Sequence, residues 1–192
     1  MKSSPQLVPT ASQTVGPFFH LGLTHPHSIA NIAGPDAKGE RVKFVCTVYD
    51  GEGKGLPDAM VEIWQADAEG SYRHPEGGQA ENHDFFGFGR LHSGPDGRCE
   101  FETIRPGRVP GWTDALQAPH LNISVFARGV LKRLATRAYF AGEPANAEDA
   151  ALALVPEERR ETLMARPDQA EKGLWHFDIY LCGPRETVFF DI

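Results

Sequence analysis

The sequence predicts a mostly β fold, an antiparallel β-sandwich with long loops and a small helical insertion. Three observations support this prediction. The first 145 residues contain no helical period, and their apolar residues alternate with polar ones in short runs. Clusters of glycine and proline separate these runs at short intervals, as in a sandwich of two sheets. The chain has 192 residues, of which 41% are hydrophobic and 23% charged, which suits one globular domain with a sizeable core.

The first 40 residues have weak periodicity and predict an extended arm with turns, ahead of a single sandwich domain over residues 41–192. The best-defined part of the arm is residues 14–19, Thr-Val-Gly-Pro-Phe-Phe. Gly16 lets the backbone approach a neighbour closely, and Pro17 then fixes the direction of the chain. Taken by themselves, these residues favour an arm that packs its two phenylalanines into a core over a role in a site.

Two strand–turn–strand patterns come next along the chain. Residues 41–49 and 59–65 read as strands on either side of a glycine-rich turn, which predicts an antiparallel hairpin. Residues 89–92 and 98–104 flank the turn Gly-Pro-Asp-Gly and predict a second hairpin.

The last third of the chain combines strands with the predicted helical insertion. Strands are expected over residues 120–126, 134–140 and 174–181, where apolar and polar residues alternate. The insertion covers about residues 146–166. Within it, Pro156 followed by two glutamates is a good helix start, and the helix is expected to run to about residue 165 on the surface.

Charge and cysteine usage limit the partners and the compartment. The net charge of −7 argues against nucleic acid and against an anionic membrane surface as partners. No run has the apolar length of a membrane span, and the first residues do not resemble a secretory signal. Cys46, Cys99 and Cys182 are widely spaced in strand-like segments, which predicts buried reduced thiols in a cytoplasmic protein.

Polar residues mark one face of the strand expected over residues 120–126. His120 and Asn122 alternate with apolar neighbours, so both point to the same side of the strand, about 7 Å apart. Two histidines at this spacing would make half of a metal site, but the second position is an asparagine. A long polar loop over residues 67–88 adds Tyr72, His74 and His83, of which the two histidines are assigned to the surface.

Two motifs resemble the core of the intradiol ring-cleavage dioxygenases, namely residues 106–110, Pro-Gly-Arg-Val-Pro, and residues 119–122, Pro-His-Leu-Asn. The resemblance covers nearly the whole chain, including residues 12–19, 177–179 and 186–191. Catalytic members of this family hold a ferric iron with two tyrosines and a His-x-His pair. The resemblance therefore assigns the four ligand positions to Tyr72, Val109, His120 and Asn122, and it puts Gln117 where an arginine flanks the metal.

This set of residues is poor at binding ferric iron. Fe3+ is a hard, highly charged cation that prefers anionic oxygen donors beside imidazole. Val109 supplies no donor, and Asn122 supplies only a neutral amide oxygen. Tyr72 without a full ligand set is expected to pack, with its hydroxyl hydrogen-bonded. We therefore expect a degenerate site with no iron of its own.

Such a pattern resembles a non-catalytic subunit of the family, which pairs with an iron-bearing homologous chain. The resemblance implies an assembly of the two chains, with Fe3+ on the partner only, that cleaves 3,4-dihydroxybenzoate with O2 to 3-carboxy-cis,cis-muconate. It also implies that Thr14, Gly16, Pro17 and Arg128 form one wall of the substrate pocket. Without the resemblance, Arg128 would be assigned to a surface ion pair.

Two other functions are compatible with the same residues. An independent dioxygenase with an atypical iron site would need a further ligand such as His74 or His83, and the isolated chain would then be coloured by phenolate-to-iron charge transfer. A non-enzymatic binding module is the other alternative, because a sandwich fold does not fix a function. Such a module would have no iron-bearing partner and no effect on ring cleavage.

Overall fold

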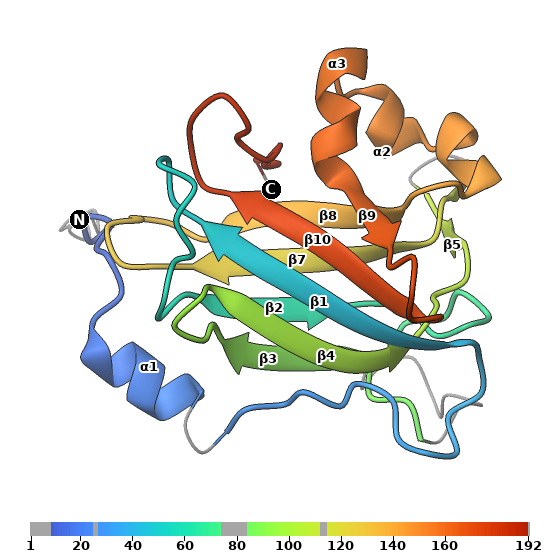
Figure 1. Cartoon of the computed structure of the whole chain (residues 1–192), viewed down its shortest axis with the longest axis horizontal. Coiled ribbons are helices and arrows are strands. Elements are labelled where there is room, and N and C mark those ends of the chain that lie inside the picture. The colour runs from blue at the N-terminus through green and yellow to red at the C-terminus, as the bar shows by residue number, and fades with distance from the viewer. Residues whose placement is uncertain (1–8, 25–26, 74–83, 112–114, 192) are drawn as a thin grey trace, which may run out of the picture.

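Figure 1 shows the computed structural model of the chain, which describes residues 9–24, 27–73, 84–111 and 115–191. The strands of the first half are β1 (Arg41–Tyr49), β2 (Met60–Trp64), β3 (Phe88–His92), β4 (Arg98–Ile104) and β5 (Val109–Pro110). Those of the second half are β6 (Leu116–Gln117), β7 (His120–Phe126), β8 (Leu134–Phe140), β9 (Met164–Pro167) and β10 (Leu174–Tyr180). The helices are α1 (Pro17–Leu23), α2 (Ala150–Ala153) and α3 (Glu157–Arg160), with 3-10 turns η1 (Pro144–Glu148) and η2 (Glu161–Leu163).

Two layers of strands lie face to face across one core (Figure 1). Eight strands follow each other in the hydrogen-bonded order β3-β2-β7-β8-β9-β10-β1-β4, and short β9 joins the two layers by pairing with both β8 and β10. Phe44, Phe101 and Phe177 of one layer meet Ile63 and Leu121 of the other, each at most 2% exposed. The predicted β-sandwich is confirmed, although two of its strand pairs, β1 with β10 and β8 with β9, are parallel.

Both predicted hairpins are wrong, although the turns between their strands exist. β1 pairs with β4 and β10, whereas β2 pairs with β3 and β7, so β1 and β2 belong to different layers. In the same way, β3 and β4 lie at opposite ends of the strand order. Each connection carries the chain from one layer to the other, and every strand still buries one face against the opposite sheet. Periodicity identifies that face but does not identify the neighbouring strand.

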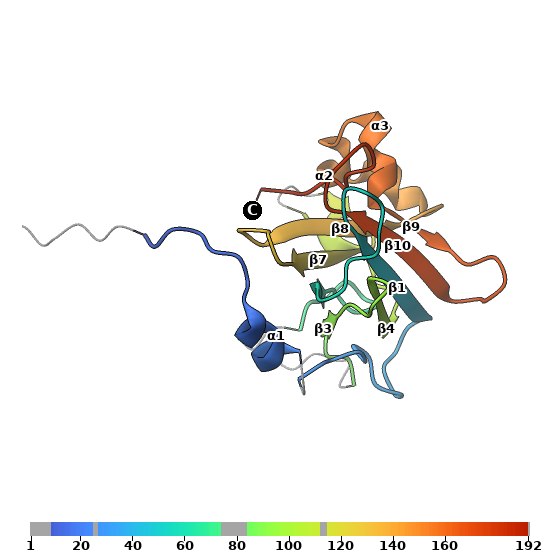
Figure 2. The same cartoon turned by 60° about the vertical axis from the view of Figure 1, so that its left-hand side comes forward.

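The arm contains a helix that the sequence analysis did not predict. α1 begins at Pro17, whose fixed φ suits the first position of a helix. Phe19 packs on Phe126 of β7 with ring centroids 5.4 Å apart, whereas Phe18 is 85% exposed, so only one of the two phenylalanines is packed. Figure 2 shows α1 beside the body of the molecule, with the described residues before it running outward.

The helical insertion lies where it was predicted, between β8 and β10, but its end differs. α3 and η2 stop at Leu163, and residues 164–167 form β9 instead of a last helical turn. Leu163 is fully buried in a second, smaller core with Leu152 and Tyr139, so the insertion is anchored to the sheet and does not lie only on the surface.

The predicted burial of the three cysteines is confirmed for two of them and wrong for the third. Cys46 and Cys99 lie opposite each other on β1 and β4 as buried free thiols, but Cys182 is exposed, because it follows the end of β10 in a turn. Among the described residues, no helix has the length and apolar character needed to cross a membrane.

Candidate functional site

The four residues that the family resemblance assigns to metal-ligand positions come from three separate parts of the chain. Tyr72 lies in the loop after β2, Val109 in β5, and His120 and Asn122 in β7. The Asn122 amide donates to the Tyr72 hydroxyl at 3.0 Å, and the Tyr72 ring stacks on Trp64 with an interplanar angle of 4°. Tyr72 thus packs with its hydroxyl hydrogen-bonded, as expected. His74 and His83 lie outside the described residues.

His120 is a neutral, buried imidazole. It is 2% exposed, and its Nδ1 lies 2.7 Å from the carbonyl oxygen of Ala118. Because a carbonyl can only accept, Nδ1 carries the proton and Nε2 keeps its lone pair. Burial, together with the nearby Arg137 charge, lowers the pKa of His120 to about 4. This residue therefore retains the form of imidazole that binds metals.

The rest of the set does not fit ferric iron. Val109 is 3% exposed and pairs with Gln117, so a hydrocarbon side chain fills its position. Burial raises the pKa of Tyr72 above its usual range, against the opposing effects of the Asn122 hydrogen bond and the Arg137 charge, so its oxygen stays a neutral phenol. Asn122 donates an amide proton to that oxygen. Within the described residues, no three His, Cys, Asp or Glu side chains are grouped so that they could hold a metal ion.

A cation that sequence reasoning missed lies beside these residues. Arg137 of β8 is directly opposite Asn122 of β7, and its Nη1 donates to Gln117 Oε1 at 2.7 Å and to the Tyr139 hydroxyl at 3.3 Å. A fixed positive charge therefore lies next to Asn122 and Gln117. The alternation of polar and apolar residues in β8 could have shown which way Arg137 points, but its nearness to Asn122 depends on strand register.

Asp149 connects the helical insertion to the same site. It is 1% exposed and caps α2 by accepting from the N–H of Leu152 at 2.8 Å. It also accepts from the Tyr139 hydroxyl at 3.1 Å and from the N–H of Ala118 at 2.7 Å. Because the Ala118 carbonyl fixes the His120 ring, Asp149 positions that ring through the backbone.

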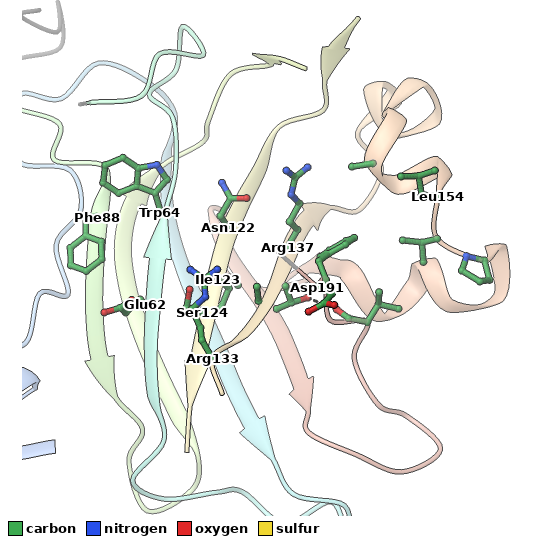
Figure 3. Close-up of a pocket in the computed structure, with 17 residues that line it drawn as sticks. Glu62, Trp64, Phe88, Asn122, Ile123, Ser124, Arg133, Arg137, Leu154 and Asp191 are labelled. Carbon is green, nitrogen blue, oxygen red and sulfur yellow. Dashed lines mark hydrogen bonds between the residues drawn. The ribbon is translucent and has the colours of Figure 1, made fainter. Parts of the chain in front are cut away.

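A cavity of about 620 Å3 adjoins Asn122 and Arg137 (Figure 3). It lies between the outer face of the layer containing β2, β3, β7 and β8, the helical insertion and the last residues of the chain. Figure 3 shows Trp64 and Phe88 on one side, with Asn122 and Arg137 next to each other on neighbouring strands. The wall toward the insertion is apolar and includes Val155 and Pro156.

The residues expected to form a substrate-pocket wall gather at the other end of the same sheet. The Gly129 N–H donates to Thr14 Oγ1 at 2.8 Å, which ties the arm to the end of β7. Gly16 and Arg128 line one cavity of about 470 Å3, and Pro17 begins the adjoining α1. The Arg128 side chain is 74% exposed and lies 3.9 Å from an Asp58 oxygen, which makes a weak surface ion pair.

The cavity beside Asn122 and Arg137 and the cavity beside Arg128 lie on one face of the sandwich, at opposite ends of β2 and β7. Met60, which lines the Arg128 cavity, is opposite Phe126, and Trp64, which lines the larger cavity, is opposite Asn122. Four residues of a strand separate the two pairs, or about 13 Å. The structure therefore brings Tyr72, His120 and Asn122 together in one group and Thr14, Gly16 and Arg128 in another.

Comparison with known proteins identifies the family. A family described as Dioxygenase matches residues 14–183. The protocatechuate 3,4-dioxygenase alpha chain of Burkholderia cepacia is 42% identical over 95% of this chain and 97% of its own length. The alpha chain of Pseudomonas putida is also 42% identical, over 97% and 98%. The beta chain of the B. cepacia enzyme is 36% identical over 86% of this chain and 74% of its own length.

Solved structures agree in fold. The dioxygenase domain of a carbohydrate-binding fusion protein from Streptomyces sp. SirexAA-E is 27% identical, with a TM-score of 0.63 over 92% of this chain and 99% of that one. The 3-chlorocatechol 1,2-dioxygenase of Rhodococcus opacus 1CP has the same TM-score of 0.63 at 22% identity, over 93% and 69%. The chain therefore belongs to the intradiol ring-cleavage dioxygenase family.

Proposed function

We propose that this chain is the alpha-type subunit of a protocatechuate 3,4-dioxygenase, which binds no iron itself and works with an iron-bearing beta-type chain in the cytoplasm. The observation that carries this proposal is the ligand set, in which Val109 and Asn122 stand at two of the four metal positions. Greater identity to alpha chains than to the beta chain, 42% against 36%, supports the same assignment. The free thiols of Cys46 and Cys99 suit a reducing compartment.

The proposed reaction opens the ring of protocatechuate, which is 3,4-dihydroxybenzoate. The bond between its two hydroxyl-bearing carbons breaks, both oxygen atoms of O2 enter the product, and 3-carboxy-cis,cis-muconate results. The ferric iron of the partner would supply the electronic activation of the catecholate toward O2. Nothing in this chain needs to donate electrons or protons to the reacting carbons.

This chain would supply one wall of the partner's substrate pocket. Arg128 is the cation on that wall, and its forked donors suit an aromatic carboxylate. Its ion pair with Asp58 is long and exposed, so little is lost when the guanidinium turns to a substrate. The bond between Thr14 and Gly129 holds Gly16 beside Arg128, so that the arm and the strand end present one surface.

Kinetics of the assembled enzyme tests this proposal. The chain alone should not cleave protocatechuate, whereas the chain expressed together with its beta-type partner should. In that complex, Arg128→Ala should raise KM for protocatechuate about tenfold, equal to about 1.4 kcal/mol, with kcat little changed. Arg98→Ala, which removes an exposed arginine of β4, is the matched control and should leave KM as it was. Turnover by the lone chain would contradict the subunit assignment, and an unchanged KM for Arg128→Ala would remove Arg128 from the pocket.

A further inference from the structure

Asp58 has an unusual backbone conformation. In the part of the chain that the structure describes, it is the only residue other than glycine in the left-handed region, with φ at 64°. Its neighbours hold this conformation in place. Pro57, just before it, has a fixed φ of its own. The buried hydroxyl of Ser93 accepts from the N–H of Ala59 at 2.9 Å and donates to the carbonyl of Leu56 at 2.7 Å. The turn that carries Asp58 is therefore fixed from both sides.

This turn brings a carboxylate to Arg128. Asp58 Oδ2 lies 3.9 Å from Arg128 Nη2, and both residues line the cavity of about 470 Å3 together with Gly16. Arg128 lies in a turn of its own, in which the N–H of Gly129 donates to the hydroxyl of Thr14. Among the described residues that line this cavity, Asp58 is the one acid and Arg128 the one base, and the others are apolar or glycine. Two fixed turns thus place opposite charges at one apolar cavity.

The stability of the fold does not account for a carboxylate at this position. Glycine adopts a left-handed backbone without the strain that a side chain brings, so the turn itself has no need of Asp58. The ion pair with Arg128 does not compensate for that strain, because its two side chains are 74% and 59% exposed and such pairs contribute little. A strained residue that brings no structural benefit points to a function of its side chain.

We propose that Asp58 lowers the affinity of this cavity for anions and thereby favours the release of the product. The inference rests on the proposed function, in which Arg128 faces the carboxylate of the substrate. A carboxylate beside Arg128 offsets part of the positive charge of the guanidinium and repels the anion that the guanidinium binds. Asp58 therefore acts by its charge on the ligand and takes no part in the chemistry of the ring.

Substrate and product differ in the charge that they bring to this wall. Protocatechuate has one carboxylate. As the bond between the two hydroxyl-bearing carbons breaks, one oxygen of O2 joins each of them, so both become carboxylates and the product has three. Repulsion from Asp58 weakens the binding of three carboxylates more than that of one. The cavity thus discriminates against the molecule that has to leave.

Titration calorimetry of Asp58→Asn in the complex with the beta-type partner tests this inference. Asparagine keeps the shape of the side chain and tolerates the left-handed backbone, so only the charge is removed. The dissociation constants of protocatechuate and of 3-carboxy-cis,cis-muconate are measured without O2, so that no turnover occurs. A unit charge about 7 Å away changes affinity roughly two- to threefold for each charge on the ligand. Asp58→Asn should therefore lower Kd about twofold for the substrate and at least about fivefold for the product, and less at high salt.

Glu158→Gln is the matched control. It removes the same charge from an exposed position on α3, which lies at the opposite end of the molecule from α1 (Figure 1), and it should change neither constant by more than about 1.5-fold. Asp58→Gly is the second variant for the case that Asp58→Asn does not assemble with the partner. It also removes the charge and suits the left-handed backbone, so it should give the same changes as Asp58→Asn.

The outcomes separate this inference from the proposed function. If the wild-type complex binds protocatechuate and Arg128→Ala weakens that binding, but Asp58→Asn leaves the Kd of the product unchanged, the inference is overturned and the proposed function stands. Equal changes for substrate and product in Asp58→Asn, or equal changes in Asp58→Asn and Glu158→Gln, would also overturn the inference, because they would point to a diffuse charge effect. A wild-type complex that binds no protocatechuate would contradict both.

Discussion

Removing the carboxylate of Asp149 should destabilise the fold severely, although this residue lies outside the sheets. In Asp149→Ala, the N–H of Ala118 and the hydroxyl of Tyr139 lose their acceptor in a buried position, and α2 loses its cap. A lost cap costs about 1 kcal/mol, and each buried donor left without a partner costs about 1–3 kcal/mol. The expected loss is about 4 kcal/mol of unfolding free energy, a large fraction of the total for a domain of this size.

Denaturant unfolding followed by circular dichroism measures this loss, and Asp168→Ala is its matched control. Asp168 also accepts three hydrogen bonds, from the N–H groups of Ala170 and Glu171 and from His176, but it does so on the surface. Water can replace those bonds, so its removal should cost only a small fraction of the loss at Asp149. Similar losses in the two variants would refute the argument that burial of the Asp149 bonds determines their contribution.

Two further predictions concern the metal positions. The unfolded chain binds a proton at His120 near its ordinary pKa of 6.5, whereas burial keeps this pKa at about 4 in the fold, so stability should fall by about 3 kcal/mol as pH falls from 6.5 to 4. The free energy of unfolding of the wild type, measured with denaturant at several pH values, should show this slope, and His120→Gln should lack it. The same slope in the wild type and the variant would contradict the assignment of this pH dependence to His120. Val109→Tyr combined with Asn122→His should restore iron binding, by at least about tenfold over either single variant, because the two missing donors return together. Iron content and visible absorption of the purified variants measure this, and a double variant that binds no more iron than the single ones would count against the ligand-loss account.

The sequence was informative wherever a local pattern determines the structure. Alternation placed His120 and Asn122 on one face of a strand that the structure has as β7. A turn signal correctly marked the end of β3 and the start of β4, because glycine and proline act within a few residues of themselves. The stacking and hydrogen bonding of Tyr72 followed from the chemistry of a buried phenol.

What the sequence could not supply depends on register and on contacts between distant segments. The pairing of β1 with β10 joins residues more than a hundred positions apart, so a local pattern suggested β2 as its partner instead. Arg137 and Asp149 had no motif of their own, and only strand pairing and the packing of the insertion bring them to His120 and Asn122. The helix at Pro17 was missed because a seven-residue helix carries too little periodicity to detect.

The location of the iron tests the central claim most directly. Metal content and visible absorption should be measured on this chain alone, on the complex with its beta-type partner, and on a complex in which the partner lacks its iron-binding tyrosine. We predict no iron and no colour in the lone chain, both in the complex, and loss of the colour in the complex with the altered partner, while Tyr72→Phe in this chain leaves the colour of the complex unchanged. Stoichiometric iron with a charge-transfer band in the lone chain would contradict the account, because Val109 and Asn122 would then not have abolished the site.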